Sequence, residues 1–116
     1  MSTAPSDDQA GVRGLLDLDR VVHEPARLAI LTVLAEAADV DFRFLEAVTG
    51  LTRGNLSSHA SKLEAAGYIE IDKSFRGRTP VTSYRITRTG RAALSAYRKK
   101  LMTLVKPDDE SDGGRS

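Results

Sequence analysis

The segment of residues 52–73 constrains the fold most, because its hydrophobic period changes once, abruptly, at Gly67. Before the glycine, apolar residues recur at helical spacing, and Thr52 is well suited to the N-cap position. After it, two isoleucines alternate with acidic residues, as they do in a half-buried strand. The segment therefore predicts a helix over residues 53–66 that is joined to a strand by a glycine turn.

The remaining elements follow from the same signals. Pro25 suits the first turn of a helix, Gly50 a left-handed helix cap, and Gly77 a hairpin turn. The expected order is an apolar helical segment over 15–22, a helix over 25–37, a turn over 39–41, a helix over 42–48, the helix over 53–66, two strands over 69–73 and 81–86, and a last helix, capped by Thr87 or Thr89, to about residue 105. The fold class is mainly α with a small β-hairpin (α+β), a winged helix-turn-helix with added N- and C-terminal helices.

Length and composition fit one domain. The chain has 116 residues, and 41% of them are apolar. We expect residues 15–106 to form the ordered domain and the polar segments 1–14 and 107–116 to be disordered tails. The absence of cysteine excludes disulfides and thiolate metal sites and favours a cytoplasmic location. No stretch approaches the roughly 20 apolar residues of a membrane helix, so no membrane association is expected.

Charge is unevenly divided along the chain. The total is only +1, but residues 53–100 carry 11 basic and 3 acidic residues, a net charge of +8, and the remainder carries −7. This asymmetry indicates that one half meets a polyanion. The alternative is a set of solvated helix faces that happen to cluster.

The outward face of the predicted helix over 53–66 is unusual. Leu56, Ala60 and Leu63 share one side, and the opposite side carries three serines, a glycine, a lysine and an asparagine. Serine and asparagine are poor helix formers, but they donate and accept hydrogen bonds and suit base edges and phosphates. The face therefore predicts contact with nucleic acid; a serine-rich solvated helix is the alternative.

The predicted hairpin places Arg76 and Arg78 at its tip, with Lys73 below them. Two guanidinium groups at a tip can reach a phosphate or a narrow minor groove. A charged hairpin that protects a sheet edge is the alternative. The predicted DNA-contacting residues are Arg53, Asn55, Ser57, Ser58, Ser61, Lys62, Lys73, Arg76, Arg78 and Thr79.

The run TRGNLSSHASKLEAAGYIE at 52–70, followed by FRGRTPVTSYRIT and TGRAAL, resembles the MarR- and ArsR-like winged helix transcriptional regulators, in particular small members without a ligand domain. The resemblance covers roughly residues 18–101. It implies that Asn55, the three serines and Lys62 face the major groove, and that the two wing arginines face the flanking backbone or minor groove.

The last helix carries apolar residues at spacings of three, four and three, which is a heptad seam. The seam predicts a homodimer, paired with the 15–22 segment; packing within one protomer is the alternative. The predicted interface residues are Leu15, Leu18, Leu94, Tyr97, Leu101 and Leu104.

Catalysis is not expected, because no nucleophile–base pair, paired carboxylates or phosphate loop is recognisable. His23 and His59 are too far apart to suggest metal spacing, so no metal site, catalytic residue or cofactor is predicted. For His59, core packing and a phosphate contact remain open. The expected partner is double-stranded DNA. The rival interpretation is a winged helix that binds another protein. A small-molecule effector stays open as well, although no dedicated pocket residues are recognisable.

Overall fold

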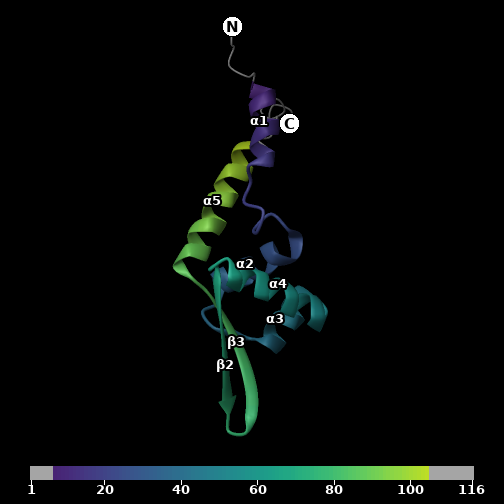
Figure 1. The fold of residues 1–116 in the computed structure, drawn as a ribbon, viewed down its shortest axis with the longest axis vertical. Coiled ribbons are helices and arrows are strands. Elements are labelled where there is room, and N and C mark those ends of the chain that lie inside the picture. The colour runs from purple at the N-terminus through teal and green to yellow at the C-terminus, as the bar shows by residue number, and fades with distance from the viewer. Residues whose placement is uncertain (1–6, 105–116) are drawn as a thin grey trace, which may run out of the picture.

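The computed structural model describes residues 7–104, in which helices pack around the base of a small antiparallel sheet. In Figure 1 the hairpin projects from one end of a helical body, while α5 and α1 lie side by side at the other end. The elements are α1 (Asp7–Leu16), α2 (Pro25–Glu36), β1 (Val40–Asp41), α3 (Phe42–Thr49), α4 (Arg53–Ala65), β2 (Ile69–Arg76), β3 (Thr79–Ile86) and α5 (Arg88–Leu104). The predicted α+β winged helix class is confirmed.

The sheet has the strand order β1-β3-β2. The hairpin is in register from Ile69 opposite Ile86 to Arg76 opposite Thr79. The segment 39–41 was expected to be a turn only, and this was wrong. Val40 and Asp41 form a short third strand against β3, with Val40 opposite Tyr84. Two residues are too few to show a period of two, so the sequence carried no signal for this strand.

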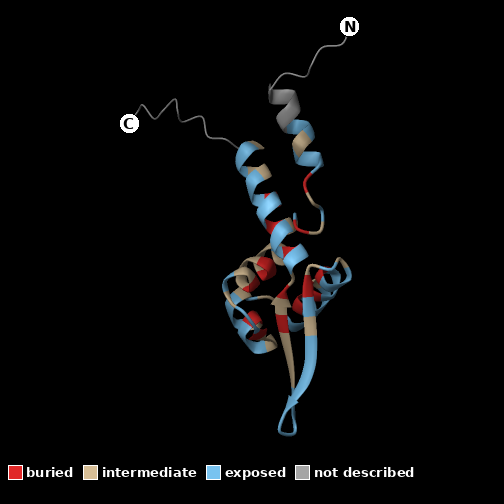
Figure 2. Ribbon diagram, turned by 90° about the vertical axis from the view of Figure 1, so that its left-hand side faces the viewer, coloured by how far each residue is buried: buried red, intermediate tan, exposed pale blue. Residues whose placement is uncertain are grey.

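The core lies where α2, α4 and α5 meet the base of the hairpin (Figure 2). The predicted buried side of α4 is confirmed, since Leu56, Ala60 and Leu63 are at most 1% exposed. On β3, Tyr84 and Ile86 share one face of the strand and are buried. This core fixes the position of α4 relative to the hairpin.

The expected turn and cap chemistry is also present. The Thr52 hydroxyl accepts a hydrogen bond from the Asn55 amide at 3.1 Å and caps α4. Gly50 ends α3 with a φ of 73°, and Gly77 turns the hairpin with a φ of 67°. Both values lie in the left-handed region that favours glycine. α5 begins after Thr87, whose hydroxyl accepts from the Gly90 amide at 2.9 Å.

The N-terminal part differs from the prediction. Helix was expected over 15–22, but α1 ends at Leu16 and the chain then bends. The Asp19 carboxylate accepts from the amides of Val21 and Val22 at 2.8 and 3.1 Å, which replaces helical hydrogen bonds. α1 also crosses the boundary that the sequence placed at residue 15. Residues 1–6 and 105–116 of the expected tails lie outside the described residues.

Three of the six predicted dimer residues are buried in the protomer's own core. Leu18 is 4% exposed, Leu94 2% and Tyr97 5%. The reason is the bend after α1, which lays residues 17–24 over α5 and lets Tyr97 Oη hydrogen-bond His23 Nδ1 at 2.8 Å. For these three residues the intramolecular alternative holds. Leu15 is 46% exposed, and Leu101 and Leu104 are half-buried.

Candidate nucleic-acid interface

Helix α4 presents a polar, solvent-exposed face opposite the core. Arg53 and Lys62 are exposed on it, as are the polar residues between them, Asn55, Ser57, Ser58 and Ser61. A Cβ added at Gly54 would meet nothing within 4 Å. The face is therefore a shallow surface of small hydrogen-bonding groups, of a size that can enter a groove of a duplex.

A groove of about 1100 Å³ separates α3 and α4 from the hairpin. Tyr84 lies at its inner end, and burial raises the pKa of its hydroxyl, which therefore stays protonated. The polar and charged residues that line the groove are Asp41, Arg43, Arg53, Ser57, Ser61, Glu64, Lys73, Arg76, Thr79 and Thr82. Helices α3 and α4 and the hairpin thus share one concave polar surface.

Four cations line this groove: Arg43 from α3, Arg53 from α4, and Lys73 and Arg76 from β2. Among residues 12–104, whose side chains the structure describes, none of them forms an ion pair with a carboxylate. Of the two acidic residues in the groove, Asp41 is engaged as the N-cap of α3 and accepts from the Phe44 amide at 2.8 Å. The groove therefore has a surplus of positive charge that can attract an anion.

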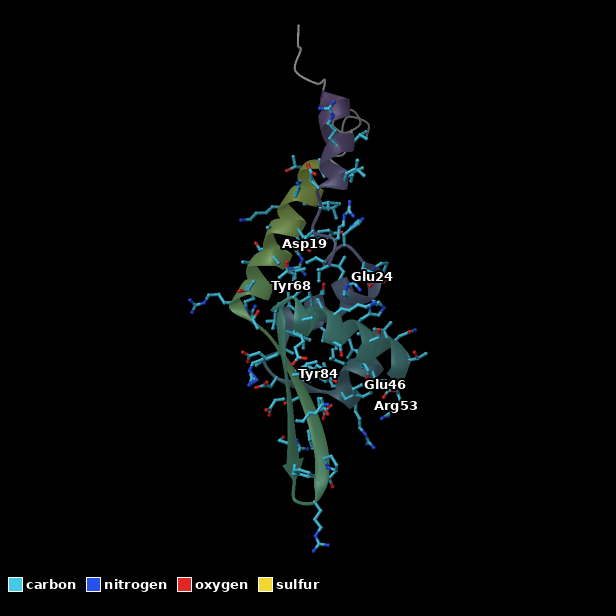
Figure 3. All side chains as sticks on the ribbon, in the orientation of Figure 1. Asp19, Glu24, Glu46, Arg53, Tyr68 and Tyr84 are labelled. Carbon is cyan, nitrogen blue, oxygen red and sulfur yellow. The ribbon has the colours of Figure 1, made fainter. Side chains whose placement is uncertain are left out.

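The Arg53 side chain is oriented by a neighbouring ring. Its guanidinium carbon lies 5.1 Å from the centre of the Phe42 ring, within cation–π range. Figure 3 shows Arg53 on the side of the molecule away from α5, beside Glu46 of α3. The stacking limits the number of conformations of a long side chain while leaving its N–H groups to the solvent.

The hairpin extends well beyond the helices (Figure 1). Gly77 and Arg78 form its turn, between the last pair, Arg76 and Thr79. Residues 72–80 are all exposed. The tip is therefore a cationic projection that nothing in the described part of the chain covers.

The structure brings six of the ten predicted contact residues to the groove and places the other four beside it. Arg53, Ser57, Ser61, Lys73, Arg76 and Thr79 line the groove. Asn55, Ser58 and Lys62 lie on the outward face of α4, and Arg78 is at the tip. Arg43 also lines the groove, although it is not among the ten predicted residues. Its position in the helix before α4 was the available signal, because that helix crosses the DNA backbone in helix-turn-helix proteins.

The two histidines have structural partners. His59 is on the side of α4 that faces α2, where its Nδ1 lies 3.2 Å from Arg27 Nη1 and 3.7 Å from Glu24 Oε1. The Arg27 amide donates to Glu24 and lowers the pKa of this carboxyl, which keeps a negative charge near the ring. His23 contacts Tyr97. Both histidines therefore join elements of the protomer.

Among residues 7–104 there is no group of three potential metal ligands placed to hold an ion. No helix in that range is both long and apolar enough to cross a membrane.

Residues 26–105 match the family described as a winged helix DNA-binding domain. The chain belongs to this family. The match begins within α2 and includes α4, the groove and the wing formed by β2 and β3. The resemblance to winged helix regulators is thereby confirmed for family and fold.

Relatives agree with this assignment. An uncharacterized protein from Methanocaldococcus jannaschii is 34% identical over 88 residues, which are 75% of this chain and 95% of the relative. The structure of a transcriptional regulator homologue from Pyrococcus horikoshii has a TM-score of 0.75 at 27% identity, covering 80% of this chain and 94% of that one. A MarR family regulator from Rhodococcus has a TM-score of 0.59 at 19% identity, covering 98% and 91%, and shows the shared winged helix fold.

Proposed function

We propose that this winged helix domain binds double-stranded DNA sequence-specifically and regulates transcription as a homodimer. The observation that carries the proposal is the groove between α4 and the wing, where four cations have no ion-pair partner among the described residues. Beside it, the small polar face of α4 offers hydrogen-bonding groups without bulk. A duplex supplies phosphates for the cations and base edges for the polar face.

The proposed contacts divide by chemistry. Asn55 and the serines of α4 read base edges in the major groove, because amides and hydroxyls match the donor and acceptor pattern there. The basic residues and Thr79 hold the phosphate backbone on both sides, and Arg78 at the tip reaches the flanking backbone or minor groove. We add Arg43 to the phosphate-binding set, because it lines the same groove from α3.

Two variants test this division. Arg78→Ala should weaken binding by a similar factor for every duplex and lower the salt slope by about one unit. Asn55→Ala should weaken binding to a selected sequence by about 1–3 kcal/mol and leave the affinity for a scrambled duplex nearly unchanged. Sequences selected from random duplexes supply the matched probe, and fluorescence anisotropy gives both affinities.

Arg85→Ala is the matched control. Arg85 is also basic and on the hairpin, but its side chain pairs with Asp39 and Glu70, at 3.7 and 3.3 Å. It should leave duplex affinity within about twofold of the parent, as expected for an exposed ion pair outside the interface. If Asn55→Ala and Arg78→Ala both lower the affinity for the selected and the scrambled duplex by the same factor, Asn55 does not contact bases. A parent that does not bind heparin or duplex would favour a protein-binding winged helix.

The dimer is proposed to form through the arm made by α1 and α5. These helices pack together through Leu104, since a Cβ on Gly14 would lie 2.7 Å from Leu104 Cδ2. Their outer surface leaves Leu15, Leu16 and Met102 exposed, the last two at 69% each. Exposed apolar side chains on a paired helical arm favour burial against a second copy. Two recognition helices would then read half-sites about 34 Å apart.

Sedimentation equilibrium tests the dimer. We expect a dimer at micromolar concentration that dissociates in Leu101→Asp. Because Leu101 also packs against the protomer core, Leu16→Asp is the sharper variant, and circular dichroism should show an unchanged fold. A monomeric parent, or a dimer that tolerates both charges, contradicts the proposed interface.

Regulation on this proposal requires no chemistry by the protein. A dimer bound at a promoter can occlude polymerase or recruit it, and we infer that it does so in the cytoplasm. Deletion of the gene, followed by transcript measurement beside the selected site, distinguishes repression from activation.

A further inference from the structure

Helix α5 carries a cationic stripe that the proposed DNA contacts do not use. Its 17 residues include five basic side chains and no acidic one. Arg88, Arg91, Arg98 and Lys99 are exposed and fall on one side of the helix, because their spacings of 3, 7 and 1 residues keep them within about a third of a turn. We call these four residues the α5 stripe.

The stripe is not neutralised by the described residues. In the part of the chain whose side chains the structure describes, residues 12–104, no carboxylate lies within ion-pair distance of it. Arg91 donates to the Ala35 carbonyl at 3.2 Å and Arg98 to the Thr32 hydroxyl at 3.4 Å, both neutral acceptors. Such contacts orient the guanidinium groups along α2 and leave their charge uncompensated.

The stripe is also remote from the candidate interface. α5 runs from the end of β3 away from the hairpin tip (Figure 1). Its exposed side faces the viewer in Figure 2, where the hairpin tip lies at the opposite end of the molecule. A duplex seated on α4 and the wing would therefore leave the stripe uncovered.

The chain itself supplies a complementary charge close by. Helix α5 ends at Leu104, and four acidic residues follow at positions 108, 109, 110 and 112. They contribute to the −7 that offsets the +8 of residues 53–100. This placement brings an acidic run within a few residues of the basic helix.

We propose that the acidic segment of residues 107–112 docks on the α5 stripe of its own chain. Eight residues beyond Leu104 reach at most about 27 Å when extended. Leu104 and Arg88 are about 24 Å apart along the helix axis, so the segment can turn back over most of the stripe. A short tether also gives an effective concentration in the millimolar range, which weak ion pairs need.

Docking would shield the stripe from other polyanions. With the segment in place, the positive charge that stays open to a duplex is concentrated around α4 and the wing. The segment thus confines nucleic acid to the face that can read sequence, and its loss should increase binding that ignores sequence.

A single spin label tests the contact directly. Because the chain has no cysteine, Ser111→Cys provides one labelling site within the acidic run. In 50 mM salt we expect the label to broaden the amide signals of residues 88–99 in an NMR spectrum. In 1 M salt the screening length falls to about 3 Å, so the signals should recover.

Neutralising the acids is the control. With the same label, the full-length variant D108N/D109N/E110Q/D112N should leave residues 88–99 sharp. Broadening that survives neutralisation, or that stops at residues 101–104, overturns the proposal. So does broadening in unlabelled protein mixed with labelled protein, because the occupant would then be a second copy.

A cycle of full-length variants tests the shielding without relying on sequence-specific binding. R88Q/K99Q removes two stripe charges that make no hydrogen bond to a described residue. On a random duplex at low salt, neutralising the acids should raise affinity by roughly tenfold, and adding R88Q/K99Q should cancel the gain. If R88Q/K99Q lowers duplex affinity by the same factor in the parent and in the variant with the neutralised tail, the stripe itself binds duplex. The proposed contact between tail and stripe is then wrong. The spin-label experiment contains no DNA, so its outcome does not depend on the proposed function.

Discussion

Replacing Gly54 with alanine should stabilise the free protein and weaken its binding to DNA. Gly54 is the second residue of α4 and lies on the outward face beside Ser58 and Ser61, four and seven residues on. Its φ is not positive, and an added Cβ would meet no atom of the protein within 4 Å. Neither backbone conformation nor packing explains a glycine at this position.

The gain in stability follows from helix propensity. Glycine costs roughly 0.5–1 kcal/mol relative to alanine within a helix, and this site is near the helix start, where the lower value applies. A change of 1 kcal/mol shifts Tm by about 4–8 °C in a domain of this size. Gly54→Ala should therefore raise Tm by about 2–4 °C.

The loss in affinity follows from the proposed orientation of α4. A methyl group pointing into a close-packed interface costs about 1–3 kcal/mol when the surroundings cannot move. That cost corresponds to a loss of roughly 5- to 150-fold in duplex affinity. The two effects have opposite signs, so a general loss of folding cannot imitate them.

Thermal unfolding followed by circular dichroism and anisotropy titration against the selected duplex give both numbers. Ala92→Gly is the reverse control, since Ala92 is exposed on α5, away from the groove. It should lower Tm by a similar amount and leave duplex affinity unchanged. If Gly54→Ala is more stable and binds DNA as tightly as the parent, the outward face of α4 does not approach the duplex.

Three further predictions concern stability. Gly90→Ala should destabilise the fold by about 1–3 kcal/mol in urea unfolding, because its Cβ would overlap the Tyr68 carbonyl group; Ala93→Gly, one turn away, should cost less. The Tyr68 hydroxyl donates to Asp19 at 2.6 Å (Figure 3), and this bond and burial raise its pKa to about 12. Because the folded pKa exceeds the unfolded value of 10, Tyr68 stabilises the fold below pH 10 and loses this effect as the pH rises towards 12. The stability difference between parent and Tyr68→Phe should therefore shrink over that range, and a constant difference would contradict it. Thr52→Ala should cost about 1 kcal/mol through loss of the α4 cap, and Thr52→Ser should restore most of it.

The parts of the fold that were predictable are those with local signals. The helix over 53–66 had a cap, an apolar period and a terminating glycine, and the structure has α4 over Arg53–Ala65. The hairpin had alternation on both strands and a glycine turn. In each case the cap or turn residues and the apolar pattern favour the same conformation, so the pattern alone was sufficient.

The parts that were not predictable depend on contacts between distant residues. The hydroxyl of Tyr68 binds Asp19 across 49 positions of sequence, and this bond helps to fix the bend after α1. Leu94 and Tyr97 fit a heptad seam equally well whether they meet a second copy or residues 17–24 of the same chain. For the candidate site, residue types on α4 and the wing indicated the chemistry, whereas Arg43 joined them only through the packing of α3 beside α4.

The connection at Thr87 makes α5 a rigid lever arm on the winged helix domain. One residue connects β3 to α5, and it is fastened to the turn after α4: its amide donates to the Tyr68 carbonyl at 2.9 Å and its hydroxyl to the Gly67 carbonyl at 2.7 Å. Helices α5 and α4 therefore turn as one body. α5 is about 25 Å long, so a tilt of 10° about this joint displaces its far end by about 4 Å. One base-pair step is about 3.4 Å. In the proposed dimer, a change of about 10° in how the two arms cross would therefore alter the operator spacing that the two subunits can span.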